Sequence, residues 1–145
     1  MYSWTQKYVG IPFRSNGRNF EGCDCYGLVR LVLQNEYDIC LPEFNLYSNA
    51  LDCHETVNLF KNFVPIICGS KISKPEEKSV CLVKTMGGLL SHVGIYAGDG
   101  FILHTRNKTG AVCERISSPF FTGRIEGWYH VHKINNSTES ILNRL

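Results

Sequence analysis

The sequence predicts a domain of the α+β class, in which N-terminal helices pack on an antiparallel β-sheet. In the first half of the chain, apolar residues recur at helical spacing in two stretches, at 25–36 and 52–64. From residue 80 onwards, short runs rich in β-branched and aromatic residues alternate with turns that contain glycine. Helices followed by a series of strands are typical of the α+β class, with the helices on one side of the sheet.

The N-terminal elements are expected to lead directly into the first long helix. Residues 2–8 suit a short helical or turn segment, and the polar, glycine-containing loop after it leads to Asp24. Aspartate commonly caps a helix N-terminus, so Asp24 is expected to begin the helix at 25–36. Leu28 and Val32 lie on the apolar face of that helix.

A connection rich in turn-forming residues separates the first helix from the second amphipathic helix, expected at 52–64. The rest of the chain is expected to form an antiparallel meander of short strands. These strands are expected at residues 80–85, 92–97, 101–105, 111–116 and 124–134.

The length of the chain predicts a single domain, at residues 1–134. Residues 135–145 are polar and are expected to form a C-terminal tail. The formal net charge is +2, and the Lys and Arg residues are scattered, so we expect no nucleic-acid partner. No apolar stretch has the length of a membrane span, so we expect no membrane partner. The N-terminal residues lack the pattern of a secretory signal, which predicts a protein made in the cytoplasm.

Seven cysteines, mostly in apolar contexts, are typical of reduced thiols that serve as small buried side chains. Cys23 and Cys25 are not spaced as C-x-x-C, so we do not expect a redox pair. Metal sites from Cys23, Cys25 and His54, or from His130 and His132, are alternatives. Neither set has the ligand spacing of a zinc site, so we expect no metal and no other cofactor.

Cys25 is the first candidate for chemistry, because it falls at the first helical position after the cap. Unpaired N–H groups and the helix dipole stabilise an anion there, so a lowered thiol pKa and a nucleophilic thiolate are expected. Gly27, in the first turn, costs about 1 kcal/mol relative to alanine, which indicates that another element approaches the helix start closely. Cys25 also shares a helix face with Val29, so its thiol is expected to point towards the core.

Two histidines, His92 and His104, lie on the two arms of a predicted hairpin. If residues 98–100 form a three-residue loop, Gly94 lies opposite His104, and the two histidines become diagonal neighbours on one face of the sheet. A two-residue loop would place them on opposite faces. The sequence therefore predicts a histidine pair, with a small residue opposite His104 to leave room for the rings.

Together these residues predict a catalytic triad, provided that the helix packs on the histidine face of the sheet. Cys25 would attack a carbonyl group, His92 would take the thiol proton, and His104 would orient His92. The backbone N–H of Cys25 is a candidate donor to the oxyanion. The expected reaction is acyl transfer, in its simplest form the hydrolysis of an amide.

Residues 10–29 (GIPFRSNGRNFEGCDCYGLV) and 91–105 (SHVGIYAGDGFILHT), with a closing strand, resemble the NlpC family of bacterial cell-wall cysteine peptidases. The likeness covers residues 4–134 and is closest to the phage tail-associated branch. It implies a papain-like α+β fold and hydrolysis of peptidoglycan stem peptides, often between D-γ-glutamyl and a diamino acid. By this resemblance, Cys25 is the nucleophile, His92 the base and His104 the orienting residue.

The resemblance also implies that Asp24, before the nucleophile, binds the amino end of the stem peptide. Two positions depart from the family pattern: Phe13 stands where many members have a tyrosine, and Tyr26 where many have a serine. Both departures concern how substrate is held and leave the Cys–His core intact.

Two other function classes remain open on the sequence. A structural tail or assembly protein of the same fold would not require Cys25, His92 and His104 together. A thiol acyltransferase would use the same chemistry but usually needs an apolar membrane-facing segment. The missing signal fits a phage tail component, with phage tail proteins as partners, and it also fits an effector delivered by a secretion machine.

Overall fold

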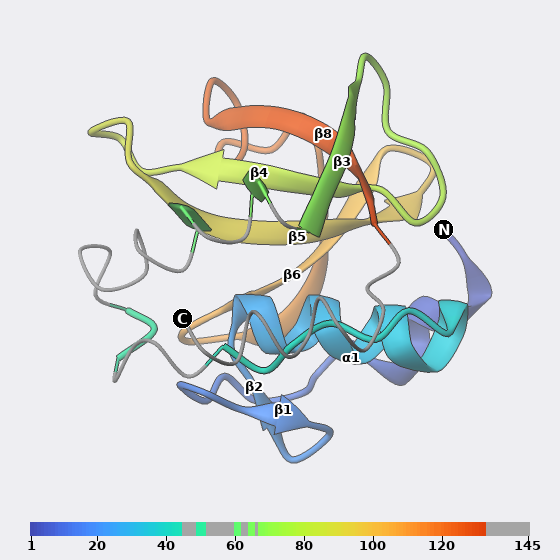
Figure 1. Cartoon of the computed structure of the whole chain (residues 1–145). Coiled ribbons are helices and arrows are strands. Elements are labelled where there is room, and N and C mark those ends of the chain that lie inside the picture. The colour runs from blue at the N-terminus through green and yellow to red at the C-terminus, as the bar shows by residue number, and fades with distance from the viewer. Residues whose placement is uncertain (45–48, 52–59, 62–63, 66, 133–145) are drawn as a thin grey trace.

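The fold is known from a computed structural model that describes residues 1–44, 49–51, 60–61, 64–65 and 67–132 (Figure 1). Helix α1 (Cys25–Tyr37) lies against an antiparallel sheet of six strands. The strands are β3 (Cys68–Ile72), β4 (Val80–Lys84), β5 (Leu90–Gly98), β6 (Phe101–Arg106), β7 (Gly110–Arg115) and β8 (Ile125–Val131). This arrangement confirms the predicted α+β class.

Smaller elements surround the start of α1. A 3₁₀-helix, η1 (Ser3–Lys7), confirms the short N-terminal helical segment. Strands β1 (Arg18–Asn19) and β2 (Gly22–Cys23) form a separate two-stranded hairpin just before α1. The second helix, expected at 52–64, lies mostly outside the described residues, although Phe60 and Lys61 within it are helical.

The strand order is β3-β8-β4-β5-β6-β7, which corrects the expected meander. Strands β4 to β7 follow one another as predicted, but β8 returns across the sheet and pairs with both β4 and β3. Strand β3 was not predicted from the sequence, because its residues Gly69, Ser70 and Lys71 give no apolar alternation. It is an edge strand, whose outer side needs no apolar residues.

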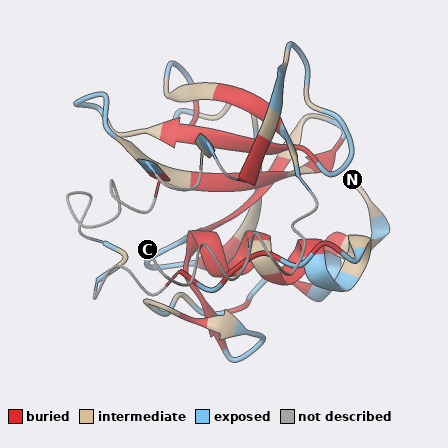
Figure 2. Ribbon diagram, in the orientation of Figure 1, coloured by how far each residue is buried: buried red, intermediate tan, exposed pale blue. Residues whose placement is uncertain are grey.

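The main core lies between α1 and one face of the sheet. Val29 and Val32 of α1 are fully buried in one cluster with Val93 and Ile95 of β5 and Leu103 of β6. Figure 2 shows buried residues along both α1 and the central strands. Within the described part of the chain, no helix combines the length and apolar character needed to cross a membrane.

The start of α1 is fixed by Asp24, as the sequence predicts. Its carboxylate Oδ1 accepts a hydrogen bond from the Gly27 N–H at 2.8 Å, and Asp24 is extended while Cys25 begins the helix. Position 27 requires a glycine, because a Cβ there would lie 1.9 Å from the Gly17 carbonyl oxygen. The loop before β1 thus packs directly on the first helical turn.

We expect Gly27→Ala to destabilise the fold by about 3 kcal/mol, because the new methyl group meets backbone rather than a flexible side chain. Urea unfolding followed by circular dichroism measures the loss. Gly87→Ala is the matched control, since a Cβ there would lie 3.7 Å from the Thr85 hydroxyl, an ordinary van der Waals contact. Equal stability of the two variants would contradict the close packing of the loop on α1.

Candidate active site

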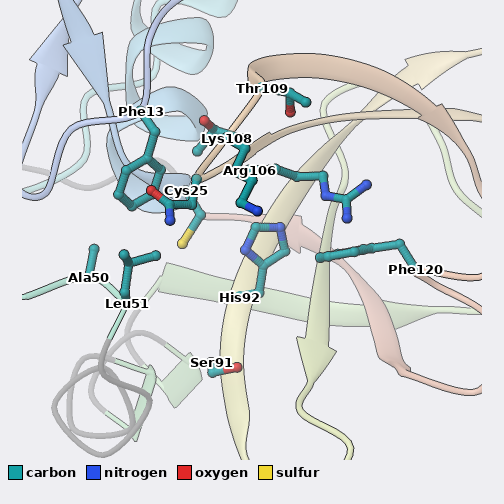
Figure 3. A pocket seen from close by; sticks show the side chains of 12 residues that line it. Phe13, Cys25, Ala50, Leu51, Ser91, His92, Arg106, Lys108, Thr109 and Phe120 are labelled. Atoms are coloured by element: carbon teal, nitrogen blue, oxygen red, sulfur yellow. The ribbon is translucent and has the colours of Figure 1, made fainter.

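A cavity of about 460 Å³ opens beside the N-terminus of α1. Cys25 of α1, Ser91 and His92 of β5, and Thr105 and Arg106 of β6 lie on its wall. Figure 3 shows the Cys25 side chain beside the His92 ring, where both line the cavity. The structure therefore brings together the cysteine and the first histidine singled out in the sequence.

Cys25 is the first residue of α1, is 7% exposed and lines the cavity. Burial, followed by the nearby Asp24 carboxylate, raises the pKa of the thiol to about 12. The backbone N–H groups of Val93 and Tyr26 act in the opposite direction but do not outweigh burial. This corrects the expectation of a lowered pKa: in the free protein Cys25 is a neutral thiol.

The two histidines form a direct pair, as predicted. His92 Nε2 lies 2.9 Å from His104 Nδ1. Ile95 pairs with Leu103 and Tyr96 with Ile102, which is the register that places both histidines on one face. The remaining ring nitrogen of His92, Nδ1, is the one available to a proton from the cavity.

The turn that joins the histidine strands differs from the expected three-residue loop. Gly98 pairs with Phe101, so the loop contains two residues, Asp99 and Gly100, both with positive φ. By itself such a loop would put the histidines on opposite faces. A one-residue shift between Tyr96 and Gly98 restores the register, as a β-bulge does.

Helix α1 does not pack on the histidine face, contrary to the condition set from the sequence. It packs on the opposite face, with Val93 and Ile95 of β5. Cys25 and His92 still line the same cavity. The β5–β6 pairing ends at Ile95 and Leu103, just before the two histidines. Figure 1 shows β6 diverging from β5 beyond that pair, towards the N-terminal end of α1, and the cavity occupies this opening.

His104 is held on its other side by Glu114 of β7. His104 Nε2 lies 3.0 Å from Glu114 Oε1, and Arg106 Nη1 lies 3.2 Å from the same oxygen. The Ser118 hydroxyl donates to Glu114 Oε2 at 3.1 Å. A hydrogen-bonded series therefore runs from the cavity through His92 and His104 to a carboxylate.

The Phe120 ring covers the histidine pair. Its centroid lies 5.6 Å from that of His92 and 4.9 Å from that of His104. The guanidinium groups of Arg106 and Arg124 lie over the same ring, at 4.8 and 4.6 Å from its centroid. The Phe120 ring is thus in contact with both imidazoles and with both guanidinium groups.

This environment keeps both histidines neutral. Burial, and then the Arg106 and Arg124 charges, lower the pKa of His104 to about 3. Burial and the neighbouring His104 hold the pKa of His92 well below its ordinary value of 6.5. The contact between His104 and Glu114 is therefore a hydrogen bond to a neutral imidazole rather than an ion pair.

Asp24, which the sequence predicts to contact a substrate amine, is not among the residues that line the cavity. Its side chain is 1% exposed, and its oxygens accept from Arg18 Nη1, from the Gly27 N–H and from the Asn16 N–H, each at 2.8 Å. Of the two departures from the family pattern, Phe13 lines the cavity. Tyr26 is buried away from it, and its hydroxyl donates to the Pro42 carbonyl.

The other cysteines give no redox or metal site among the described residues. Cys23 is a free thiol that contacts the Asn19 carbonyl at 3.1 Å. His130 lies 3.4 Å from Glu76 on the surface. His54, part of one alternative metal set, lies outside the described residues. In the part of the chain that the structure describes, no group of three or more potential metal ligands is found.

Glu114, Arg106 and Phe120 were not singled out from the sequence. A signal for Glu114 was present: it lies ten residues after His104 across a short turn, with the same parity. Observed pairing of His104 with Val112 and of Ile102 with Glu114 makes Glu114 the diagonal neighbour of His104. Phe120 and Arg124 lie outside that hairpin, so their approach depends on tertiary folding.

An antiparallel sheet with a helix that carries a cysteine to a histidine-lined cavity defines the papain-like class of cysteine peptidases. The model of the NlpC/P60 family matches residues 10–129, and the chain belongs to that family. Members of the NlpC/P60 family are cysteine peptidases and peptidoglycan hydrolases. Family membership thus confirms the resemblance seen in the sequence and its papain-like fold.

One similar curated protein is the Gamma-DL-glutamyl hydrolase of Bacillus subtilis (strain 168), with 26% identity over 92% of this chain. The chain spans 28% of the length of that relative. An NlpC/P60 family protein from Bacillus cereus ATCC 10987 has a TM-score of 0.61 and 18% identity, over 86% of this chain and 36% of that one.

A third similar protein is the NlpC/p60 domain of the peptidoglycan hydrolase SagA. It has a TM-score of 0.57 and 16% identity, with 86% of this chain and 91% of that chain covered. At such identities the two structures establish the fold alone.

We expect the free energy of unfolding to fall as the pH drops from about 6.5 towards about 5. In this range the histidines of the unfolded chain take up protons, whereas His92 and His104 of the folded protein stay neutral. The pKa of His92 and that of His104 are both lowered, so the loss begins below the ordinary value of 6.5. Each histidine that stays neutral in the folded protein adds about 1.4 kcal/mol per pH unit to the slope of the unfolding free energy against pH. Urea unfolding at a series of pH values measures it.

His130→Gln is the control for this slope, because His130 is exposed on β8. It should leave the slope unchanged, whereas His92→Gln should reduce it. A stability that does not change over this pH range, or an equal effect of the two substitutions, would contradict the neutral buried pair.

Proposed function

We propose that this chain hydrolyses amide bonds of peptidoglycan stem peptides, with Cys25 as nucleophile, His92 as general base and His104 as orienting residue. One observation carries the proposal: Cys25 and His92 line the same cavity, while His104 holds the far side of the His92 ring at 2.9 Å. This leaves His92 Nδ1 to face the thiol. A catalytically silent tail protein would not need such an arrangement.

The first half of the reaction forms a thioester. His92 Nδ1 takes the proton of the Cys25 thiol as the sulfur attacks the carbonyl carbon of the scissile amide. The tetrahedral oxyanion develops near the start of α1, where the Cys25 backbone N–H is the candidate donor. The C–N bond then breaks, and the leaving amine takes the proton from His92.

The second half of the reaction regenerates the thiol. A water molecule gives a proton to neutral His92 Nδ1 and attacks the thioester carbonyl. Collapse of the second tetrahedral intermediate breaks the C–S bond, and the proton on His92 returns to the Cys25 sulfur. Because burial and Asp24 raise the thiol pKa to about 12, proton transfer accompanies attack rather than preceding it.

The proposed bond lies between D-γ-glutamyl and a diamino acid. Family membership supports the peptidoglycan substrate, and the name of the Gamma-DL-glutamyl hydrolase relative supports the γ-glutamyl side of the bond. Lys108 and Arg106 place positive charge at the cavity, which suits the free α-carboxylate of a γ-linked glutamyl residue. A role within a phage tail or as a delivered effector is supported by the sequence resemblance alone.

Asp24 has a supporting role in this proposal. Because its carboxylate is occupied by Arg18 and by the backbone of Asn16 and Gly27, it holds Cys25 at the helix start. The substrate is then bound by groups on the cavity wall, such as Lys108 and Thr109, rather than by Asp24.

We expect purified peptidoglycan and free stem peptides to acquire a new cut on incubation with the protein, detected by mass spectrometry, because the cavity presents a thiol and a base together. Cys25→Ala should abolish the cut, and Cys113→Ala, which removes a thiol outside the cavity, should retain it. A cut that persists in Cys25→Ala would contradict the assigned nucleophile. The absence of any cut by the wild-type protein would favour the structural or acyltransferase alternative.

We expect the acid limb of the kcat/KM profile to lie below pH 6.5. General-base catalysis requires neutral His92, and burial with the adjacent His104 keeps its pKa well below 6.5. Activity should therefore persist as the pH falls below the value at which an ordinary histidine is protonated. Initial rates at low substrate concentration, measured where the protein stays folded, test this, and an acid limb above pH 6.5 would contradict it.

A further inference from the structure

The histidine pair ends on a carboxylate that the proposed reaction has not used. Glu114 Oε1 lies 3.0 Å from His104 Nε2, and His104 Nδ1 lies 2.9 Å from His92 Nε2. The three side chains come from β7, β6 and β5, which are adjacent strands. The series therefore runs across the sheet, with the cavity at one end and Glu114 at the other.

We propose that Glu114 is a positioning residue that fixes the tautomers of both histidines, so that His92 presents an unprotonated Nδ1 to Cys25. This inference rests on the proposed function of the Cys25 site. A carboxylate only accepts hydrogen bonds, so His104 must carry its proton on Nε2. A neutral imidazole has one N–H, so His104 Nδ1 accepts, and His92 Nε2 must donate to it.

The burial of His104 restricts which of its nitrogens can carry the proton. His104 is fully buried, and the Arg106 and Arg124 charges act with burial to keep it neutral. A neutral ring cannot donate from both nitrogens, so the proton on Nε2 leaves Nδ1 as an acceptor. The acceptor at Glu114 thereby sets the tautomer of His92 as well, through the His104 ring that lies between them.

The Glu114 carboxylate is itself held in place. Arg106 donates to Oε1 at 3.2 Å, and the Ser118 hydroxyl donates to Oε2 at 3.1 Å. Donors on both oxygens keep the group as an acceptor and fix its plane. Glu114 is partly covered, with a side chain 20% exposed, so its partners are not exchanged freely for water.

Loss of the Glu114 carboxylate would allow His104 to adopt the opposite tautomer. With no obligatory acceptor at Nε2, His104 is free to carry its proton on Nδ1 and donate it to His92 Nε2. His92 would then carry its own proton on Nδ1. This nitrogen faces the thiol, and once protonated it could not accept the thiol proton. Such a molecule keeps the fold and the cavity but lacks the base.

Glu114 also acts on the charge balance around His92. The groups whose charges shift the pKa of His92 are His104 and Arg106 of β6, Arg124 before β8, and Glu114 of β7, while the neutral Cys25 thiol lines the same cavity. The first three lower the pKa of His92, and Glu114 opposes them. Removal of the Glu114 charge should therefore move the acid limb of activity further down in pH.

Glu114→Gln tests the inference, with Glu126→Gln as the matched control. Glu126 also accepts from a cation and a hydroxyl, Lys71 at 3.2 Å and Tyr129, but it lies on β8 outside the cavity wall. Long-range ¹H–¹⁵N NMR spectra of the full chain report the tautomer of each histidine. Steady-state kinetics on stem peptide report kcat, KM and the pH profile.

We expect both His92 and His104 of the wild-type protein to be protonated on Nε2. Glu114→Gln should populate the Nδ1–H form, reduce kcat by about 10- to 100-fold with KM changed by less than about twofold, and lower the acid limb. Glu126→Gln should change none of these. His104 protonated on Nδ1 in the wild-type protein, or full kcat with an unmoved acid limb in Glu114→Gln, would overturn the inference.

The two proposals fail in different ways. The NMR measurement does not need turnover, so the wrong tautomer overturns the role of Glu114 even if the wild-type protein cuts stem peptides. The expected tautomers, shifted by Glu114→Gln, in a wild-type protein that cuts nothing would support the role of Glu114 in setting the tautomers and overturn the proposed function instead.

Discussion

The buried Asp24 carboxylate is the interaction on which the geometry of the site depends. It joins three parts of the chain, because it caps α1 through Gly27, pairs with Arg18 of β1 and accepts the Asn16 N–H, each at 2.8 Å. A carboxylate buried to 1% exposure is stable only with such a full set of donors. Cys25 follows it directly, so the position of the thiol is set by the same bonds that order the loop.

The same constraint has an electrostatic consequence. A negative charge next to Cys25 opposes the helix N-terminus, and with burial it keeps the thiol protonated. On the other side of the cavity, burial and the Arg106 and Arg124 charges lower the pKa of both imidazoles and keep them neutral. A neutral thiol therefore faces a neutral base, and charge separates only when a carbonyl is present to take up the developing anion.

The sequence predicted those features that depend on local pattern. The α1 helix, its Asp24 cap and the parity of the two histidines follow from residue spacing over short distances. Strand β3 and the position of β8 could not be predicted, because edge strands carry little apolar pattern and strand order is set by long-range packing. The hairpin loop was wrong in length, yet the register was right, because a bulge between Tyr96 and Gly98 compensates.

That bulge shows which constraint governs this hairpin. A glycine-flanked two-residue loop with both residues at positive φ matches the twist of the strands, so the turn has its own preference for length. The faces of β5 are set independently, since Val93 and Ile95 must stay in the core against α1. Only an extra residue between the turn and the core satisfies both requirements. The positions of His92 and His104 on one face thus follow from burial of their neighbours, while the separate β6–β7 register places Glu114 beside His104.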